Sequence, residues 1–448
     1  MRRSVAGSAI ATLLAGALLA VVSLAGGGRA AAVEAASGPS PAVKTRLPNR
    51  LTVIVQENPI APVVAASLFV RVGSRWETDE NAGITNLLQL LLVKGTTTRS
   101  ALEIAEATER LGGSLSASAD PDFSELRGTA LSRNWTALLE LMADIALRPS
   151  LPADELEGER RVTLTSLRTR QDQPFSAAFD TLAARLFGGH PYGRPVLGRA
   201  ESVERLDRAP LLAHYQRYYR AGRMVLSVSG DVSGPAVLAA ARRLFAEAPT
   251  GDGGSDPVLP RPTAGADRTR VARASAQAQV LMGFLAPPMH HPDYAAMKVL
   301  SAALGGGMSG RLFTELRDKQ GLAYSTSAQN PSRVDTSFFF AQLGTAPANA
   351  TKAEEGLAQQ IERLRRERLS AGALERARMY LLGQFALDRR TNARLAWYHG
   401  WFEVMGVGHD FAERYARAVR AVTVEELHRA ANTYLGRPTT VTLGPPTP

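Results

Sequence analysis

The spacing of apolar residues along the chain predicts short strands and many helices. Apolar and polar residues alternate over residues 51–56 and 65–72, which is typical of half-buried strands, and Pro59 and Pro62 mark the turn between them. Further strands are predicted at residues 114–119, 123–131, 224–229, 278–285, 323–329, 336–343 and 439–443. Helical spacing predicts helices at residues 82–93, 100–111, 135–146, 154–169, 175–187, 211–219, 234–244, 292–304, 311–319, 352–368, 373–387, 395–404, 411–419 and 425–434.

The predicted elements occur in the same order twice. Residues 249–267 are rich in Gly, Asp, Ser and Pro and are predicted to form a linker. A strand, helices, a pair of strands, long helices and a final strand occur on both sides of it. This order indicates an α+β fold of two homologous domains, each an antiparallel sheet packed with helices. We expect these domains at residues 45–248 and 268–445, in keeping with a chain of 448 residues.

The N-terminal segment has the composition of an export signal. Arg2 and Arg3 precede an uncharged run at residues 4–28, and small residues follow at 30–32. We expect a signal peptide over residues 1–32, a leader over residues 33–44, and a periplasmic or secreted protein without a membrane segment after cleavage. An uncleaved anchor is the alternative, although the Ala, Gly and Ser content makes a poor span. The chain has no cysteine and therefore no disulfide.

The net charge of +10 comes mainly from arginines that are scattered along the chain. No block of Lys and Arg of the kind that follows a phosphate backbone is present. The charge pattern therefore argues against a nucleic-acid partner and indicates a solvated basic surface.

One apolar helical segment, residues 83–96, ends in Lys-Gly-Thr and resembles the first helix of the pitrilysin-type (M16) zinc metallopeptidases. In that family the helix carries His-x-x-Glu-His ahead of Lys-Gly-Thr. In register, Asn86 stands at the first His, Gln89 at the Glu and Leu90 at the second His. An amide and an aliphatic side chain cannot replace imidazole ligands of zinc, and the Gln89 amide cannot take a proton from water. Taken alone, residues 83–96 also fit a plain buried amphipathic helix.

The family's further ligand, a glutamate on a later helix, is also replaced. The matching stretch is residues 159–166, where Glu159 is retained and Ser166 stands at the ligand position. The resemblance therefore implies that this chain binds no metal. It leaves the role of Glu159 open, with a charge on a helix surface as the default.

A second stretch, residues 304–324, resembles the segment of the family's C-terminal domain that carries an Arg/Tyr pair. The matching residues are Arg317 and Tyr324, and the preceding glycines, Gly305, Gly306 and Gly307, match a loop that approaches substrate. In the family this pair reaches toward the zinc-bound substrate, where a phenol can donate a hydrogen bond to an oxyanion and a guanidinium can bind carbonyl groups.

Each residue of this stretch also has a plainer interpretation. Arg317 alone fits a solvated helix end, and Tyr324 alone fits a half-buried strand aromatic. The glycines fit a dinucleotide fingerprint only by accident, because they follow a helix and not a strand. Shorter matches to the family occur at residues 190–195, 218–219 and 229–232.

The resemblance implies a non-catalytic subunit of an exported heterodimeric zinc peptidase. Its partner would be an M16B-type catalytic subunit that carries His-x-x-Glu-His and the zinc, and the substrates would be peptides or unfolded segments. A catalytically inert structural or peptide-binding member of the superfamily is the alternative. An independent metalloenzyme with relocated ligands is a third, weaker interpretation.

Overall fold

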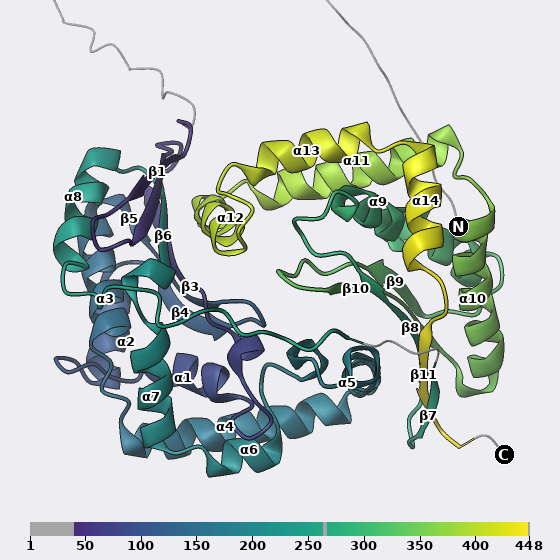
Figure 1. The fold of residues 1–448 in the computed structure, drawn as a ribbon, viewed down its shortest axis with the longest axis horizontal. Coiled ribbons are helices and arrows are strands. Elements are labelled where there is room, and N and C mark those ends of the chain that lie inside the picture. The colour runs from purple at the N-terminus through teal and green to yellow at the C-terminus, as the bar shows by residue number, and fades with distance from the viewer. Residues whose placement is uncertain (1–39, 263–266, 447–448) are drawn as a thin grey trace, which may run out of the picture. The chain divides into compact units, whose positions relative to one another are not determined.

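Two mixed β-sheets organise the protein (Figure 1), as seen in a computed structural model that describes residues 40–262 and 267–446. The first sheet has the strand order β1-β2-β6-β3-β5-β4 and the second has the order β7-β11-β8-β10-β9. The first six strands are β1 (Val43–Arg46), β2 (Thr52–Glu57), β3 (Val63–Val70), β4 (Ser114–Ala119), β5 (Ser124–Leu131) and β6 (Met224–Gly230). The others are β7 (Arg268–Ala272), β8 (Ala278–Ala286), β9 (Ser325–Gln329), β10 (Ser337–Thr345) and β11 (Thr439–Gly444).

The two sheets have one topology, which confirms the predicted α+β fold with two homologous halves. With β1 set aside, β2-β6-β3-β5-β4 corresponds strand for strand to β7-β11-β8-β10-β9. The expectation of wholly antiparallel sheets is wrong in one respect. The pairs β2–β6 and β7–β11 are parallel, because β6 and β11 return to their sheets only after long helical connections.

Helices fill the connections between the strands. In the first half they are α1 (Ile84–Leu92), α2 (Ala101–Arg110), α3 (Trp135–Leu147), α4 (Ala153–Asp172), α5 (Pro174–Phe187), α6 (Ala200–Arg205), α7 (Arg208–Tyr218) and α8 (Gly234–Leu244). In the second half they are α9 (Tyr294–Gly305), α10 (Ala350–Arg366), α11 (Ala371–Asp388), α12 (Asn392–Val404), α13 (Phe411–Ala421) and α14 (Val424–Tyr434). Residues Phe313–Asp318 form a π-helical turn, η6, within the helix predicted at residues 311–319.

One helix of each half packs against the sheet of the other half. Helix α5 of the first half packs against β8 and β11 of the second sheet, and α12 of the second half packs against β3 and β6 of the first. These are equivalent strands in the two sheets. On α12, a Cβ atom at Gly400 would lie 2.4 Å from the ring of Phe69, so glycine permits the close approach. Each half therefore completes the covering of the other half's sheet.

Two strands and one α-helix of the described residues were not predicted from the sequence, namely β1, β7 and the short helix α6. Among the described strands, β1 pairs only with β2 and β7 only with β11, and their residues are exposed or half-buried. Edge strands of this kind need no alternation of buried apolar residues. The pattern that revealed the other strands was therefore absent.

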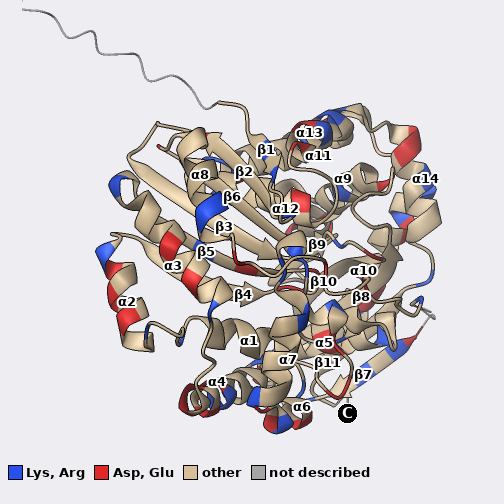
Figure 2. Ribbon diagram, turned by 60° about the vertical axis from the view of Figure 1, so that its left-hand side comes forward, with Lys and Arg blue, Asp and Glu red and all other residues tan. Residues whose placement is uncertain are grey.

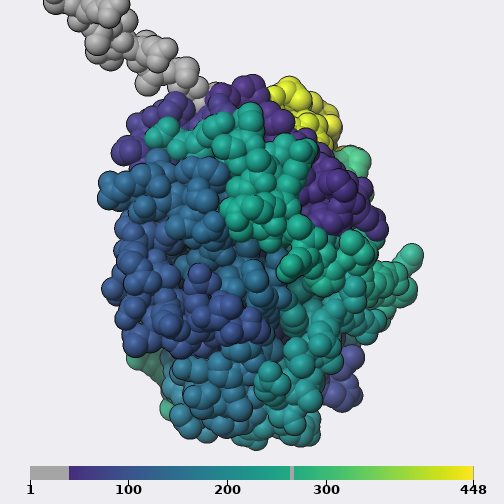
Figure 3. All heavy atoms as spheres, turned by 90° about the vertical axis from the view of Figure 1, so that its left-hand side faces the viewer, coloured from purple at the N-terminus to yellow at the C-terminus, as the bar shows by residue number. Residues whose placement is uncertain are grey.

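Apolar residues form three buried clusters, and charge lies outside them. One cluster fills the first half, and a second fills the second half and extends to Phe69 and Phe123 of the first. A third lies between α5 and the second sheet, with members such as Leu182, Phe187 and Phe340. Basic and acidic residues alternate over outer helices such as α2, α4, α13 and α14 (Figure 2). The side of the molecule formed mainly by the first half is shown in Figure 3. Within residues 40–262 and 267–446, no helix is long and apolar enough to cross a membrane.

Candidate functional site

Helix α1 positions the residues that stand at the zinc-motif positions. It packs against α4 and α7. The side chain of Gln89 is 1% exposed, and its amide donates a hydrogen bond to the hydroxyl of Tyr219, which follows α7. Burial raises the pKa of Tyr219, so this phenol stays neutral and can accept the bond. Gln89 is thus held inside the fold by a neutral partner, where a general base would need access to water.

The remaining zinc-site positions offer no ligand set. Asn86 and Leu90 are partly buried on α1, and the amide nitrogen of Asn86 is buried without a hydrogen-bond partner. On α4 the Ser166 hydroxyl donates to the carbonyl oxygen of Val162 at 2.9 Å. Zinc requires imidazole, thiolate or carboxylate donors, so these residues do not fit the ion. Among the described residues, no three His, Cys, Asp or Glu side chains lie close enough together to hold a metal.

An ion pair joins α4 to the residue two positions after α1. The Lys94 Nζ atom lies 2.8 Å from a carboxylate oxygen of Glu159 and 3.7 Å from one of Glu155. The hydrogen bond with Glu159 raises the pKa of Lys94. Glu159 is only 8% exposed, so the default expectation of a surface charge is wrong. Glu159 therefore links α4 to the segment that follows α1.

The backbone of the glycine loop at the end of α9 packs closely against the backbone of β9. A Cβ atom on Gly305 would lie 2.0 Å from the backbone nitrogen of Ala328 on β9. Gly307 has a φ of 66°, which other residues rarely adopt. The loop therefore requires small residues for its fold alone, and Gly306 between them packs on the backbone of Ala302.

Arg317 and Tyr324 lie exposed on either side of a tight turn. The turn is closed by Gly321, whose φ is 62° and whose N–H donates to the Arg317 carbonyl at 3.0 Å. The Tyr324 backbone N–H donates to the Gly344 carbonyl at 2.9 Å, while its side chain is 60% exposed. The Arg317 guanidinium lies 4.8 Å from the ring centre of Phe313. Within the described residues, no hydrogen bond joins the guanidinium to the phenol, so both can reach an external group.

Asn86, Gln89 and Leu90 thus lie on α1 and Ser166 lies on α4, and these two helices pack together. In the described part of the chain, no hydrogen bond or ion pair links α1 or α4 to residues 305–324. The bond between Gln89 and Tyr219 and the pair between Lys94 and Glu159 were not predicted. The paired tyrosines at residues 218–219 and the Lys-Gly-Thr sequence were the only signals for them.

Comparisons with known proteins identify the family. A family profile described as "Insulinase (Peptidase family M16)" matches residues 52–200, and one described as "Peptidase M16 inactive domain" matches residues 205–381. An uncharacterized zinc protease of Mycobacterium tuberculosis is 32% identical over 399 residues, which cover 88% of this chain and 91% of that protein. The chain belongs to peptidase family M16.

A further relative and two solved structures are similar to the chain over most of its length. An uncharacterized zinc protease of Bacillus subtilis is 26% identical over 384 residues, covering 86% of this chain and 93% of that protein. Two solved structures, a peptidase M16 inactive domain from Pseudomonas fluorescens and a protease from Helicobacter pylori, share the fold. Each has a TM-score of 0.84 at 24% identity, and they cover 91% and 90% of this chain and 98% and 100% of their own. The resemblance inferred from residues 83–96 and 304–324 is confirmed.

Proposed function

We propose that this protein is the non-catalytic subunit of an exported heterodimeric zinc peptidase that cleaves peptides or unfolded segments. The partner is an M16B-type subunit that carries His-x-x-Glu-His and the zinc. The match of residues 205–381 to the M16 inactive domain supports a subunit of this kind. The export signal expected at residues 1–32 lies outside the described residues, and export is part of the proposal.

One observation carries the proposal. Every metal-ligand and base position of the family's first helix holds a side chain that cannot serve, while Arg317 and Tyr324 are exposed and free of each other. A chain that acted alone would have no use for an oxyanion donor without a nucleophile. Supplied to a partner's active site, Tyr324 donates a hydrogen bond to the developing oxyanion, and Arg317 binds a substrate carbonyl group.

The test is reconstitution of peptide cleavage with the catalytic partner. The loss of one oxyanion donor lowers kcat by about 10² to 10³-fold, so Tyr324→Phe is expected to lower kcat by about this factor with the complex intact. Arg317→Ala is expected to raise KM and lower kcat. Arg420→Ala, which removes an exposed guanidinium from α13, is the matched control and should leave cleavage unchanged.

Two results would overturn the proposal. Undiminished cleavage with both Tyr324→Phe and Arg317→Ala in an assembled complex would favour the inert structural or peptide-binding member. Chelator-sensitive cleavage by the isolated chain would instead show that it carries its own metal site.

A further inference from the structure

A cavity of about 580 Å³ lies among α9, α11, α12 and α13, and neither Arg317 nor Tyr324 lines it. Its walls are largely aromatic and include Phe385, Trp401, Phe411 and Tyr415. Cavities of this volume with apolar walls and a few polar groups are typical of sites for small ligands or single side chains. The wall composition favours a ligand with an aromatic or large apolar part.

Lys298 of α9 lines this cavity and a second one of about 510 Å³, which extends to Gly305 and Gly306 of the glycine loop. The Lys298 side chain is partly buried, and its amine donates a hydrogen bond to the backbone carbonyl of Asn330. Its Nζ atom lies 5.1 Å from the ring centre of Tyr294. Among the described residues it has no carboxylate partner.

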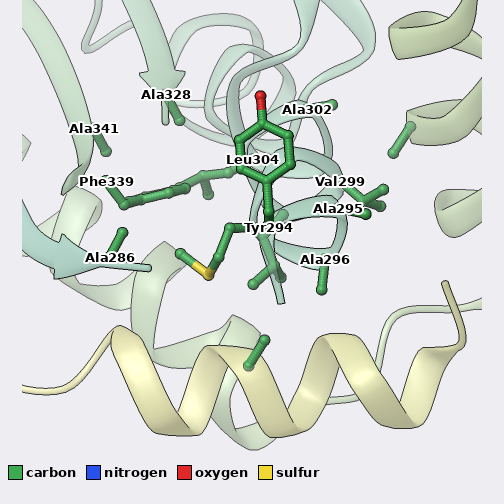
Figure 4. Close-up of a cluster of buried hydrophobic side chains, with 14 of the residues drawn as sticks. Ala286, Tyr294, Ala295, Ala296, Val299, Ala302, Leu304, Ala328, Phe339 and Ala341 are labelled. Atoms are coloured by element: carbon green, nitrogen blue, oxygen red, sulfur yellow. The ribbon is translucent and has the colours of Figure 1, made fainter. Parts of the chain in front are cut away.

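The neighbouring Tyr294 belongs both to the buried apolar cluster and to the wall of the cavity. Figure 4 shows its ring rising from the buried apolar cluster with the hydroxyl at the outer end. That hydroxyl hydrogen-bonds the Ser332 hydroxyl at 2.7 Å. Lys298 therefore lies at the boundary between a dry core and a cavity that a ligand can enter.

The choice of lysine at this position is itself informative. The chain has 47 arginines and only 5 lysines, so arginine provides most of its positive charge. Burial, with a smaller contribution from the charge of Arg333, lowers the pKa of Lys298 to about 7. An arginine would stay charged in the same place at any ordinary pH. Lysine gives this wall an amine that gains its proton when an anion arrives.

The charges around the cavity favour an anion. Asp388 is the acidic side chain of the wall, and it accepts hydrogen bonds from Arg394 and from Tyr398, the latter at 2.6 Å. Arg390, also in the wall, donates to the Leu387 carbonyl and has no carboxylate partner among the described residues. With Asp388 already neutralised by Arg394, the cavity carries uncompensated positive charge.

We propose that this cavity binds a carboxylate attached to an aromatic or large apolar group, with the carboxylate on Lys298 and the apolar part among the aromatic walls. Two sources share that chemistry, the C-terminal residue of a peptide and a free aryl-substituted carboxylic acid. The peptide source rests on the proposed function and would make the cavity a recognition site for C-terminal residues.

The binding experiment uses the isolated full chain and isothermal titration calorimetry. The probes are N-acetyl-phenylalanine, its amide, and a hexapeptide that ends in phenylalanine with a free carboxylate. We expect at least one of the two carboxylates to bind and the amide to bind at least tenfold more weakly. Binding of the hexapeptide but not the free acid identifies a peptide site, and binding of both identifies a site for the shared group.

Lysine variants separate this site from non-specific attraction to a basic protein. Lys298→Met keeps the length of the side chain and removes the amine, so it should weaken carboxylate binding at least tenfold. Lys352→Met, at an exposed position of α10, is the matched control and should have no effect. Equal affinity for acid and amide, no binding of either carboxylate, or unchanged affinity in Lys298→Met would overturn the proposal.

The pH dependence gives an independent readout. The groups that face Lys298 or line its cavity with it are Tyr294, Arg333, Asp388, Arg390, Tyr398 and Tyr415. Burial raises the pKa of all three tyrosines, and for Asp388 the bonds from Arg394 and Tyr398 outweigh burial and lower its pKa. Lys298, with its pKa lowered to about 7, is therefore the group whose charge should control binding near neutral pH. Affinity should fall about tenfold per pH unit above about pH 7 and be flat in Lys298→Met.

The outcome is separable from that of the proposed function. The titration needs no catalytic partner, so it gives a result even if reconstitution fails. Conversely, if the carboxylates do not bind, a loss of cleavage in Tyr324→Phe would still support the proposed function.

Discussion

The contact between α12 and the first sheet can be tested by adding one methyl group at Gly400. In the native structure, the Cβ atom of an alanine there would lie 2.4 and 2.6 Å from two ring atoms of Phe69 and 3.1 Å from the Cβ atom of Ser227. The Phe69 ring is fully buried and is held by Phe123 at 5.3 Å and Trp397 at 6.5 Å between ring centres. It therefore has no room to retreat, and α12 must move away from the sheet.

The expected magnitude follows from two opposing effects. Overpacking in a tight interior costs about 1–3 kcal/mol, and the lack of space behind Phe69 favours the upper end. Replacing glycine by alanine inside a helix contributes about 1 kcal/mol in the other direction. Gly400→Ala should therefore lower the free energy of unfolding by about 2 kcal/mol. Gly383→Ala, on an exposed face of α11 where a Cβ atom meets nothing within 4 Å, should raise it by about 1 kcal/mol.

The assay is urea unfolding followed by circular dichroism and by tryptophan fluorescence, to which Trp397 on α12 contributes. Helix propensity is common to both variants, so their difference of about 3 kcal/mol reports the steric overlap alone. If Gly400→Ala were as stable as Gly383→Ala, the packing of α12 against β3 and β6 would be refuted.

Three further predictions follow from other contacts. Burial, opposed by the charge of Arg333, raises the pKa of Asp122 to about 6, so the native state binds a proton that the unfolded state has already lost. The free energy of unfolding should therefore fall by about 3 kcal/mol in all as pH rises from about 3 to 7, and urea midpoints of Asp122→Asn should lack this slope. The triple variant Asn86→His, Leu90→His, Ser166→Glu restores the family's zinc ligands and should retain stoichiometric zinc after dialysis, whereas the wild type should not. A folded triple variant that retains no zinc would contradict the alignment of α1 and α4 with the family's metal site. Ser100→Ala removes the side-chain cap of α2 and should cost about 1 kcal/mol in thermal or urea unfolding, with no change in the slope against urea.

Local pattern was sufficient for most elements, because each strand or helix with one buried face repeats its apolar residues at a fixed spacing. The bounds of β4 and α8 agree with the predicted ones to the residue. The edge strands β1 and β7 bury too few apolar side chains to show such a spacing, so neither was predicted. The π-helical turn at residues 313–318 has the same apolar periodicity as an α-helix over so short a length, so sequence could not distinguish it.

The sequence by itself showed which catalytic groups of the family this chain lacks. The identities of Asn86, Gln89, Leu90 and Ser166 exclude the family's zinc ligands and base whatever the fold, because ligand capacity belongs to the side chain. Arg317 and Tyr324 were likewise identified from the sequence motif that surrounds them.

Only the tertiary structure decided what the remaining side chains do. It joined Glu159 to Lys94, buried Gln89 against Tyr219, placed α12 on the first sheet, and set Lys298 in an aromatic cavity. Periodicity shows that a face of a helix is buried, but it does not show which partner covers that face. The partners here lie up to several hundred residues away, and their meeting depends on how both sheets and all the crossing helices pack at once.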